Sequence, residues 1–128
     1  MEIEHLGLNV ADPAAAADWY VQHLGMRIVL ASDEPVPVRF LADSAGHVML
    51  EIYRNPEADV PSYADADPLV LHLAFRSDDV AADAQRLLAA GATPAQEPFI
   101  TDAGDAIAIV RDPWGFPVQL AQRHAPML

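Results

Sequence analysis

Apolar and polar residues alternate over several short stretches of the chain, and other stretches show apolar residues at helical spacing. Residues 3–10 (IEHLGLNV) alternate as a β-strand does, and Asp12 and Pro13 then supply an N-cap and a first-turn proline for a helix that we expect to end at Gly25. Three extended runs follow, at residues 26–31, 36–43 and 47–54. The first half of the chain therefore predicts the order β-α-β-β-β.

The second half repeats this plan. Residues 69–75 (LVLHLAF) predict a strand, Asp79 precedes a helical pattern, and Gly91 predicts the end of that helix. Extended runs follow at residues 92–100, 105–112 and 116–123, of which the first has the weakest strand pattern. The stretch between the halves is rich in proline and acidic residues, as linkers are.

Matched landmarks in the two halves are separated by a nearly constant interval. His72 follows His5 by 67 positions, Asp79 follows Asp12 by 67, and Gln119 follows Glu51 by 68. This spacing predicts a duplicated unit within one α+β domain over residues 1–128, although chance similarity between strand–helix patterns is the alternative. We expect a first module at about residues 1–55, a linker at about 56–68 and a second module at about 69–124.

The net charge of the chain limits the classes of partner that we expect it to bind. Its formal charge is −12, which opposes binding to nucleic acid or to anionic membranes, so a small molecule is the expected partner. All seven basic residues are arginine, so Schiff-base chemistry on lysine is excluded. Cysteine is absent, which excludes thiolate chemistry, and the N-terminal sequence lacks the pattern of a signal peptide. We expect a cytoplasmic protein.

Side chains along a strand alternate between two faces, and this alternation groups four polar residues. In the strands expected at residues 3–10, 47–54, 69–75 and 116–123, one face is aliphatic and suited to packing under a helix. In the third of these strands that face would consist of Leu69, Leu71, Leu73 and Phe75. The opposite faces carry one polar residue each: His5, Glu51, His72 and Gln119.

Two imidazoles and two side-chain oxygens suit a borderline divalent ion such as zinc, nickel, cobalt, manganese or iron. A lone buried histidine is more often simply hydrogen-bonded. The joint pattern favours ligation, because a cation beside two neutral imidazoles would compensate a buried carboxylate. For His23, His47 and His124 we favour solvated or capping roles.

The residues at these positions resemble the vicinal oxygen chelate superfamily, which includes glyoxalase I, methylmalonyl-CoA epimerase, extradiol dioxygenases and bleomycin-sequestering proteins. The resemblance is carried by residues 3–26, 48–54, 70–79 and 110–123. It implies two tandem β-α-β-β-β modules that form a cupped eight-stranded mixed sheet around one divalent metal. The ligands that it implies are His5, Glu51, His72 and Gln119. Many members are dimers, so we also expect a homodimer, with the modules paired either within one chain or between chains.

The likeness is closest to glyoxalase I, with two departures. Asn55 matches an asparagine that holds glutathione there, but Asn9 stands where a glutathione-binding arginine is expected. Gln119 replaces a glutamate and cannot take up a proton, which leaves Glu51 as the candidate base. The amide would also leave a bound metal more positive and better able to polarise a carbonyl.

Several functions remain open at this point. We expect a metal-dependent lyase or isomerase that moves a proton next to a carbonyl, with Glu51 as ligand and base. The alternatives are a metal-free drug- or metabolite-binding protein, an epimerase and a dioxygenase. The candidates for contact with the small molecule are Asn9, Tyr53, Asn55 and Arg76. Arg76 could equally pair with Asp78 or Asp79. We expect the aromatic residues of the turn at 112–117 to pack rather than to cover a site.

Overall fold

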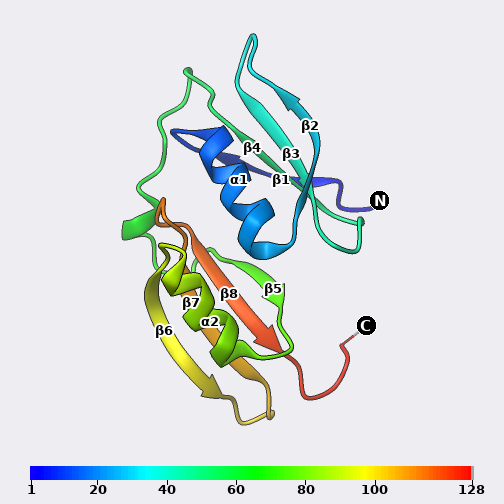
Figure 1. The fold of residues 1–128 in the computed structure, drawn as a ribbon, viewed down its shortest axis with the longest axis vertical. Helices are drawn as coiled ribbons and strands as arrows, with labels where there is room; N and C mark the ends of the chain where they lie inside the picture. Colours follow the sequence, from blue (N-terminus) through cyan, green and yellow to red (C-terminus); the bar gives the residue numbers. More distant parts are fainter. Residues whose placement is uncertain (128) are drawn as a thin grey trace. The chain divides into compact units, whose positions relative to one another are not determined.

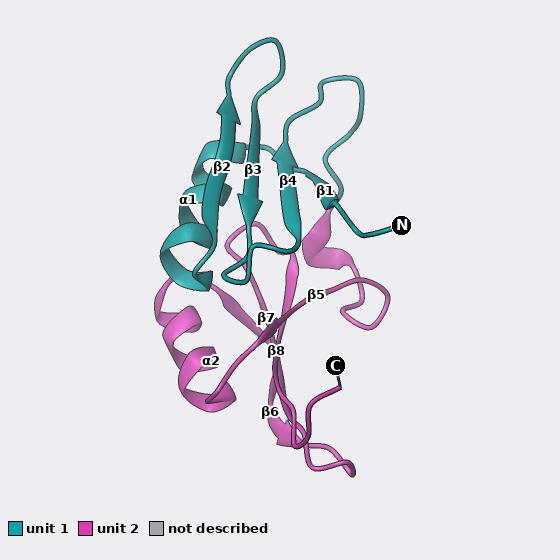
Figure 2. Ribbon diagram, turned by 90° about the vertical axis from the view of Figure 1, so that its right-hand side faces the viewer, with its two compact units in different colours: residues 1–61 teal, residues 62–128 magenta. Residues whose placement is uncertain are grey.

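Each half of the chain forms a four-stranded mixed sheet with one helix packed on it (Figure 1). This is a computed structural model that describes residues 1–127, and the chain divides into two units between Pro61 and Ser62 (Figure 2). We call residues 1–61 unit 1 and the remainder unit 2. The division falls inside the stretch that we expected to be linker, and part of that stretch is a short 3-10 helix, η1 (Tyr63–Asp65).

Unit 1 has the sheet order β1-β4-β3-β2, in which β1 and β4 are parallel and the other neighbours antiparallel. Its elements are β1 (His5–Asn9), α1 (Pro13–Leu24), β2 (Arg27–Ser32), β3 (Val38–Ala42) and β4 (Met49–Tyr53). The Asp12 carboxylate accepts the amide hydrogen bond of Ala15 at 3.0 Å, and Gly25 ends the helix with a φ of 68°. Both helix ends are therefore where the sequence predicts them.

Unit 2 repeats this topology with the order β5-β8-β7-β6 and a parallel pair of β5 and β8. Its elements are β5 (Leu73–Arg76), α2 (Val80–Ala89), β6 (Thr93–Ile100), β7 (Ala106–Arg111) and β8 (Pro117–Gln122). The α+β class and the repeated β-α-β-β-β module are confirmed. None of the helices in residues 1–127 is long and apolar enough to span a membrane.

Within β4 and β8, the aliphatic faces inferred from alternation lie in the core, beneath the helices. In unit 1, α1 packs on β3 and β4 with Leu41, Leu50 and Ile52 at most 2 % exposed. In unit 2, α2 buries Leu87 against a sheet in which Val118 and Leu120 are equally buried. Glu51 lies between Leu50 and Ile52 and Gln119 between Val118 and Leu120, so both point to the opposite face of their sheets.

The predicted start of β5 is wrong. We expected a strand from Leu69, but Pro68–Val70 form a turn and β5 begins at Leu73. The reason is Asp67, whose carbonyl accepts the Val70 amide at 2.9 Å while its carboxylate accepts the Leu69 amide at 2.9 Å. Leu69 is 79 % exposed and Leu71 42 % exposed, so the expectation that they lie under a helix is also wrong.

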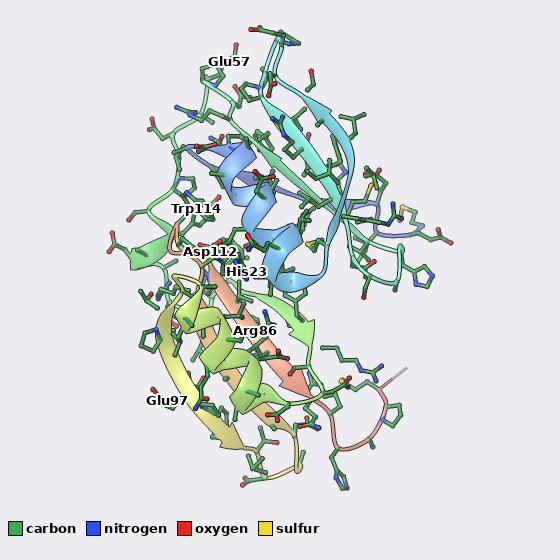
Figure 3. All side chains as sticks on the ribbon, in the orientation of Figure 1. His23, Glu57, Arg86, Glu97, Asp112 and Trp114 are labelled. Atoms are coloured by element: carbon green, nitrogen blue, oxygen red, sulfur yellow. The ribbon has the colours of Figure 1, made fainter. Side chains whose placement is uncertain are left out.

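The aromatic turn before β8 packs inside unit 2. The rings of Phe116 and Tyr63 meet edge to face at 5.1 Å, and Phe116 is 2 % exposed. Asp112 is buried, and its carboxylate accepts the amides of Trp114 and Phe116 (Figure 3). The Arg111 guanidinium donates to the carbonyls of Tyr63 and Ala66, so turn and 3-10 helix are fixed together.

Candidate metal-binding residues and adjoining cavity

Both units place a histidine at or just before the first strand and an oxygen donor at the equivalent position of the last strand. In unit 1, Gly7 of β1 pairs with Glu51 of β4, and His5 lies two positions before Gly7. In unit 2, Ala74 of β5 pairs with Gln119 of β8, and His72 lies two positions before Ala74. We call His5 and Glu51 the first donor pair, and His72 and Gln119 the second donor pair.

The first donor pair is in close approach. The His5 Nε2 atom lies 3.4 Å from Glu51 Oε2, and the two side chains are 38 % and 27 % exposed. On its other side, the His5 Nδ1 atom contacts the Glu4 carboxylate, and Phe40 of β3 meets the imidazole edge to face. The hydrogen bond to Glu4 raises the pKa of His5 above its ordinary value of 6.5, against partial desolvation and with help from the charges of Glu4 and Glu51.

The second donor pair belongs to unit 2 and contains no carboxylate. His72 lies just before β5 rather than within it, and its Nδ1 atom is 2.7 Å from the Pro68 carbonyl oxygen. Because a carbonyl only accepts hydrogen bonds, Nδ1 carries the proton and Nε2 of the neutral ring keeps its lone pair. Gln119 is half-buried in β8, between Ala74 of β5 and Ile109 of β7.

This donor chemistry fits a divalent cation. In both histidines an oxygen engages Nδ1, an arrangement that orients the ring and directs Nε2 towards a metal. Among residues 1–127, no group of three or more His, Cys, Asp or Glu side chains suited to a metal occurs. Each unit contributes two of the four expected donors, and the fourth is the amide of Gln119.

A cavity of about 530 Å³ adjoins Glu51 within unit 1. Glu51, Tyr53 and Asn55 line it from β4 and the residues that follow. The β2–β3 hairpin supplies the remaining wall: Ser32, Glu34, Pro35, Val36 and Val38. The sequence interpretation missed this hairpin wall, because much of it lies in a loop where strand alternation assigns no face.

Gly7 leaves room for the polar face of β4. A Cβ atom at this position would lie 3.3 Å from Cε1 of Tyr53 and 3.4 Å from Oε2 of Glu51. The absence of a side chain on β1 therefore lets the phenol ring lie across the strand beside the Glu51 carboxylate. Unit 2 has Ala74 in place of Gly7 and Ala121 two positions after Gln119, so it lacks this pair.

Asn9 has a structural role in unit 1. It is 8 % exposed, and its amide nitrogen donates to the carbonyls of Ala58 and Asp59 at 3.1 and 3.2 Å. Its side-chain oxygen accepts the backbone amide of Asn55 at 2.9 Å, which fixes the loop after β4. Asn55 in turn accepts the Glu57 amide with its own side-chain oxygen while it lines the cavity.

Arg76 is a surface residue in unit 2. Its side chain is 89 % exposed, and a guanidinium nitrogen lies 3.7 Å from the Asp78 carboxylate. An exposed pair of this kind contributes little to stability.

The comparisons with known proteins agree with this architecture. The sequence profile of the Glyoxalase/Bleomycin resistance protein/Dioxygenase superfamily matches residues 2–120. The chain belongs to this superfamily. No curated protein matches it.

Several solved structures share the fold over nearly the whole chain. SMU.1112c is 28 % identical with a TM-score of 0.74, over 95 % of this chain and 98 % of its own. A mutant of glyoxalase I from Zea mays is 25 % identical with a TM-score of 0.76, over 97 % of this chain but 46 % of the maize chain. TnmS3, an antibiotic-binding protein from Streptomyces sp. CB03234, is 24 % identical with a TM-score of 0.73, over 96 % of both chains, a likeness that concerns the fold alone.

Proposed function

We propose that this protein is a divalent-metal-dependent lyase or isomerase that moves a proton next to a carbonyl group of a small molecule. In this proposal His5, Glu51, His72 and Gln119 hold one metal ion, within one chain or between the two chains of a homodimer. The observation that supports it most is the 3.4 Å approach of His5 Nε2 to Glu51 Oε2, with the Nδ1 of each histidine engaged by an oxygen.

The residues divide the chemical work between them. When bound, the metal would polarise the substrate carbonyl and make the neighbouring carbon acid stronger. Glu51 is the base: its Oε2 takes the proton from that carbon and returns it to the adjacent position or to the leaving group. Gln119 is a neutral ligand that does not take up a proton. The half-buried position of Glu51 limits the access of water to its carboxylate.

Metal binding is the first test of this proposal. Purified protein should retain about one equivalent of one of the five candidate ions per four-donor site after dialysis, as measured by mass spectrometry. Replacing the donors should lower the metal affinity in the order of their charge, with Glu51→Ala costing about 100-fold and Gln119→Ala about tenfold. Failure of the wild-type protein to retain any of the ions would overturn the metal-dependent function.

Matched controls separate ligation from general effects. His47 and Glu97 are exposed and lie outside the two donor pairs, so His47→Ala and Glu97→Gln should leave metal content unchanged while His72→Ala and Glu51→Gln lower it. Activity on the substrate, once identified, should be lost in Glu51→Gln. Full activity in that variant would exclude Glu51 as the base.

The second candidate function is metal-independent binding of a small molecule, as in an antibiotic-binding protein. It is favoured by the cavity of about 530 Å³ beside Glu51, a volume within the usual range for small-molecule sites. Ligand binding that is unaffected by a chelator would support this function over the first.

A further inference from the structure

The cavity beside Glu51 has an unbalanced charge. Two of its lining residues, Glu34 and Glu51, are acidic, and no arginine or histidine lines it. Lysine is absent from the whole chain. An anionic group bound there would therefore find no cationic side chain in the wall and would approach two carboxylates.

The nearest arginines along the sequence are engaged elsewhere in unit 1. Arg39 follows the lining residue Val38, but its guanidinium lies 2.6 Å from the Asp33 carboxylate and also donates to the Ser32 carbonyl. Arg54 follows Tyr53, and its guanidinium donates to the carbonyls of Asn55 and Ala58. Because both guanidinium groups are engaged in these local contacts, they do not offset the negative charge of the cavity.

The rest of the wall is mainly apolar and partly aromatic. Pro35, Val36 and Val38 contribute hydrocarbon surface, and Tyr53 contributes a ring that the missing side chain of Gly7 allows to lie beside Glu51. An aromatic ring close to carboxylates attracts cations through its electron-rich face as well as through charge. This lining matches a molecule that has an apolar body and a positive charge.

We propose that the cavity binds small molecules that carry an ammonium group on an apolar body, and that Glu34 at the hairpin selects the positive charge. The inference deepens the proposed function and rests on it, because it names the class of small molecule that would reach Glu51. A divalent metal held by Glu51 and three neutral donors would reverse the charge at that position, so Glu34 is the group that attracts the ammonium in the metal-loaded protein.

Two fluorescent probes test this selectivity. Both carry a dansyl group on a five-carbon chain, and one chain ends in a primary ammonium while the other ends in a carboxylate. Fluorescence titration of the chelator-treated protein should show about tenfold tighter binding of the ammonium probe, and the preference should be smaller in the metal-loaded protein, where the cation offsets the charge of Glu51. Glu34→Gln should reduce that preference about threefold, and Tyr53→Ala should weaken the ammonium probe further.

The control accounts for the overall charge of −12, which attracts any cation. Glu97→Gln removes the same charge from β6 of unit 2, far from the cavity in sequence and outside its lining, and should leave the preference unchanged (Figure 3). Equal affinity of the two probes, or equal effects of Glu34→Gln and Glu97→Gln, would overturn the inference.

Metal content measured on the same preparations separates this inference from the proposed function. If the purified protein holds metal but the chelator-treated protein shows no preference for the ammonium probe, the inference alone is overturned. A preference that depends on Glu34 in a protein that retains no metal would overturn the metal-dependent chemistry and leave the cavity as a cation-selective binding site.

Discussion

The two units contain similar aspartate–glycine turns before their last strand, in different surroundings. In unit 1, Asp43 accepts the amides of Gly46 and His47 with its carboxylate, and in unit 2 Asp112 accepts those of Trp114 and Phe116. In both turns a glycine three residues after the aspartate has a positive φ, 74° at Gly46 and 91° at Gly115. The turn is therefore a local structure that both halves of the duplicated chain retain.

The surroundings differ because the η1 segment packs only on the turn of unit 2. Asp112 is 5 % exposed, and a Cβ atom on Gly115 would lie 2.7 Å from the Ala64 backbone nitrogen. Gly46 is exposed, and a Cβ atom there would meet only the end of the Arg27 side chain, at 3.5 Å. The comparison teaches that similar aspartate–glycine turns can differ in packing: the turn of unit 2 packs against another segment, and that of unit 1 is exposed.

The strands that carry the donor residues also differ, but here unit 1 has the features that unit 2 lacks. Unit 1 has the charged donor Glu51, the aromatic Tyr53 and the open position Gly7, where unit 2 has Gln119, Ala121 and Ala74. Unit 1 therefore presents the more reactive polar face, and unit 2 contains the more extensively buried turn. This division is consistent with a duplicated module whose copies have acquired separate roles.

Substitution of the two glycines gives the largest expected effect. Gly115→Ala combines a left-handed backbone with a clash against the Ala64 backbone and should cost about 3 kcal/mol of unfolding free energy. Gly46→Ala has the same backbone problem without the clash and should cost about 1 kcal/mol. Urea unfolding of the two variants measures both values, and equal costs would refute the difference in packing.

Much of this comparison could be predicted from the sequence, and the limits have physical causes. Alternation placed Glu51 and Gln119 opposite the buried Leu50 and Val118, because each is inside a regular strand. The same reasoning failed at Leu69, where the side chain of Asp67 stabilises a turn in an apolar run that resembles a strand. Propensity and periodicity do not report such local side-chain hydrogen bonds.

The candidate site was predictable only in part for a similar reason. The close approach of His5 and Glu51 follows from strand pairing, which the sequence pattern anticipates. The wall around Glu34 belongs to a hairpin loop, and the role of Asn9 depends on a loop 49 residues away in sequence. Contacts that a loop makes at long range have no periodic signal in the sequence.

Substitutions at Gly7 and Tyr53 test the difference between the donor strands of the two units. Their expected effect on stability is of intermediate size. Alanine in place of a strand glycine normally stabilises by about 0.5–1 kcal/mol, but at Gly7 its methyl group would crowd the Tyr53 ring. Gly7→Ala should therefore be close to neutral in the wild type and stabilising in a Tyr53→Ala background, with a coupling of about 1 kcal/mol by urea unfolding.

Unit 2 supplies the control for this double-mutant cycle. Ala74→Gly changes the equivalent position of β5 in the reverse direction and should cost about 0.5–1 kcal/mol whether or not Tyr53 is present. If Gly7→Ala and Tyr53→Ala were additive, the ring would not depend on the open position at Gly7.

The smallest expected effect concerns a carboxylate that ties down the chain after β8 in unit 2. The Asp105 carboxylate accepts the backbone amide of His124 at 2.8 Å and pairs with Arg123 at 2.7 Å. The hydrogen bond from His124, followed by that from Arg123, holds the pKa of Asp105 below its ordinary value of 3.8, against partial desolvation. The folded chain thus binds this proton less readily than the unfolded chain does.

The sign of the pH dependence follows from that difference in pKa. A lowered pKa means that the contribution of Asp105 to stability is fully present above about pH 4–5 and is lost as the pH falls below 3.8, through the folded-state pKa. Asp105→Asn should therefore be less stable than the wild type at pH 7, and the difference should shrink towards pH 3. Asp102→Asn in the same loop removes an equal charge and should show no such convergence, so urea midpoints of the two variants across this range decide whether the tether, or only net charge, is responsible.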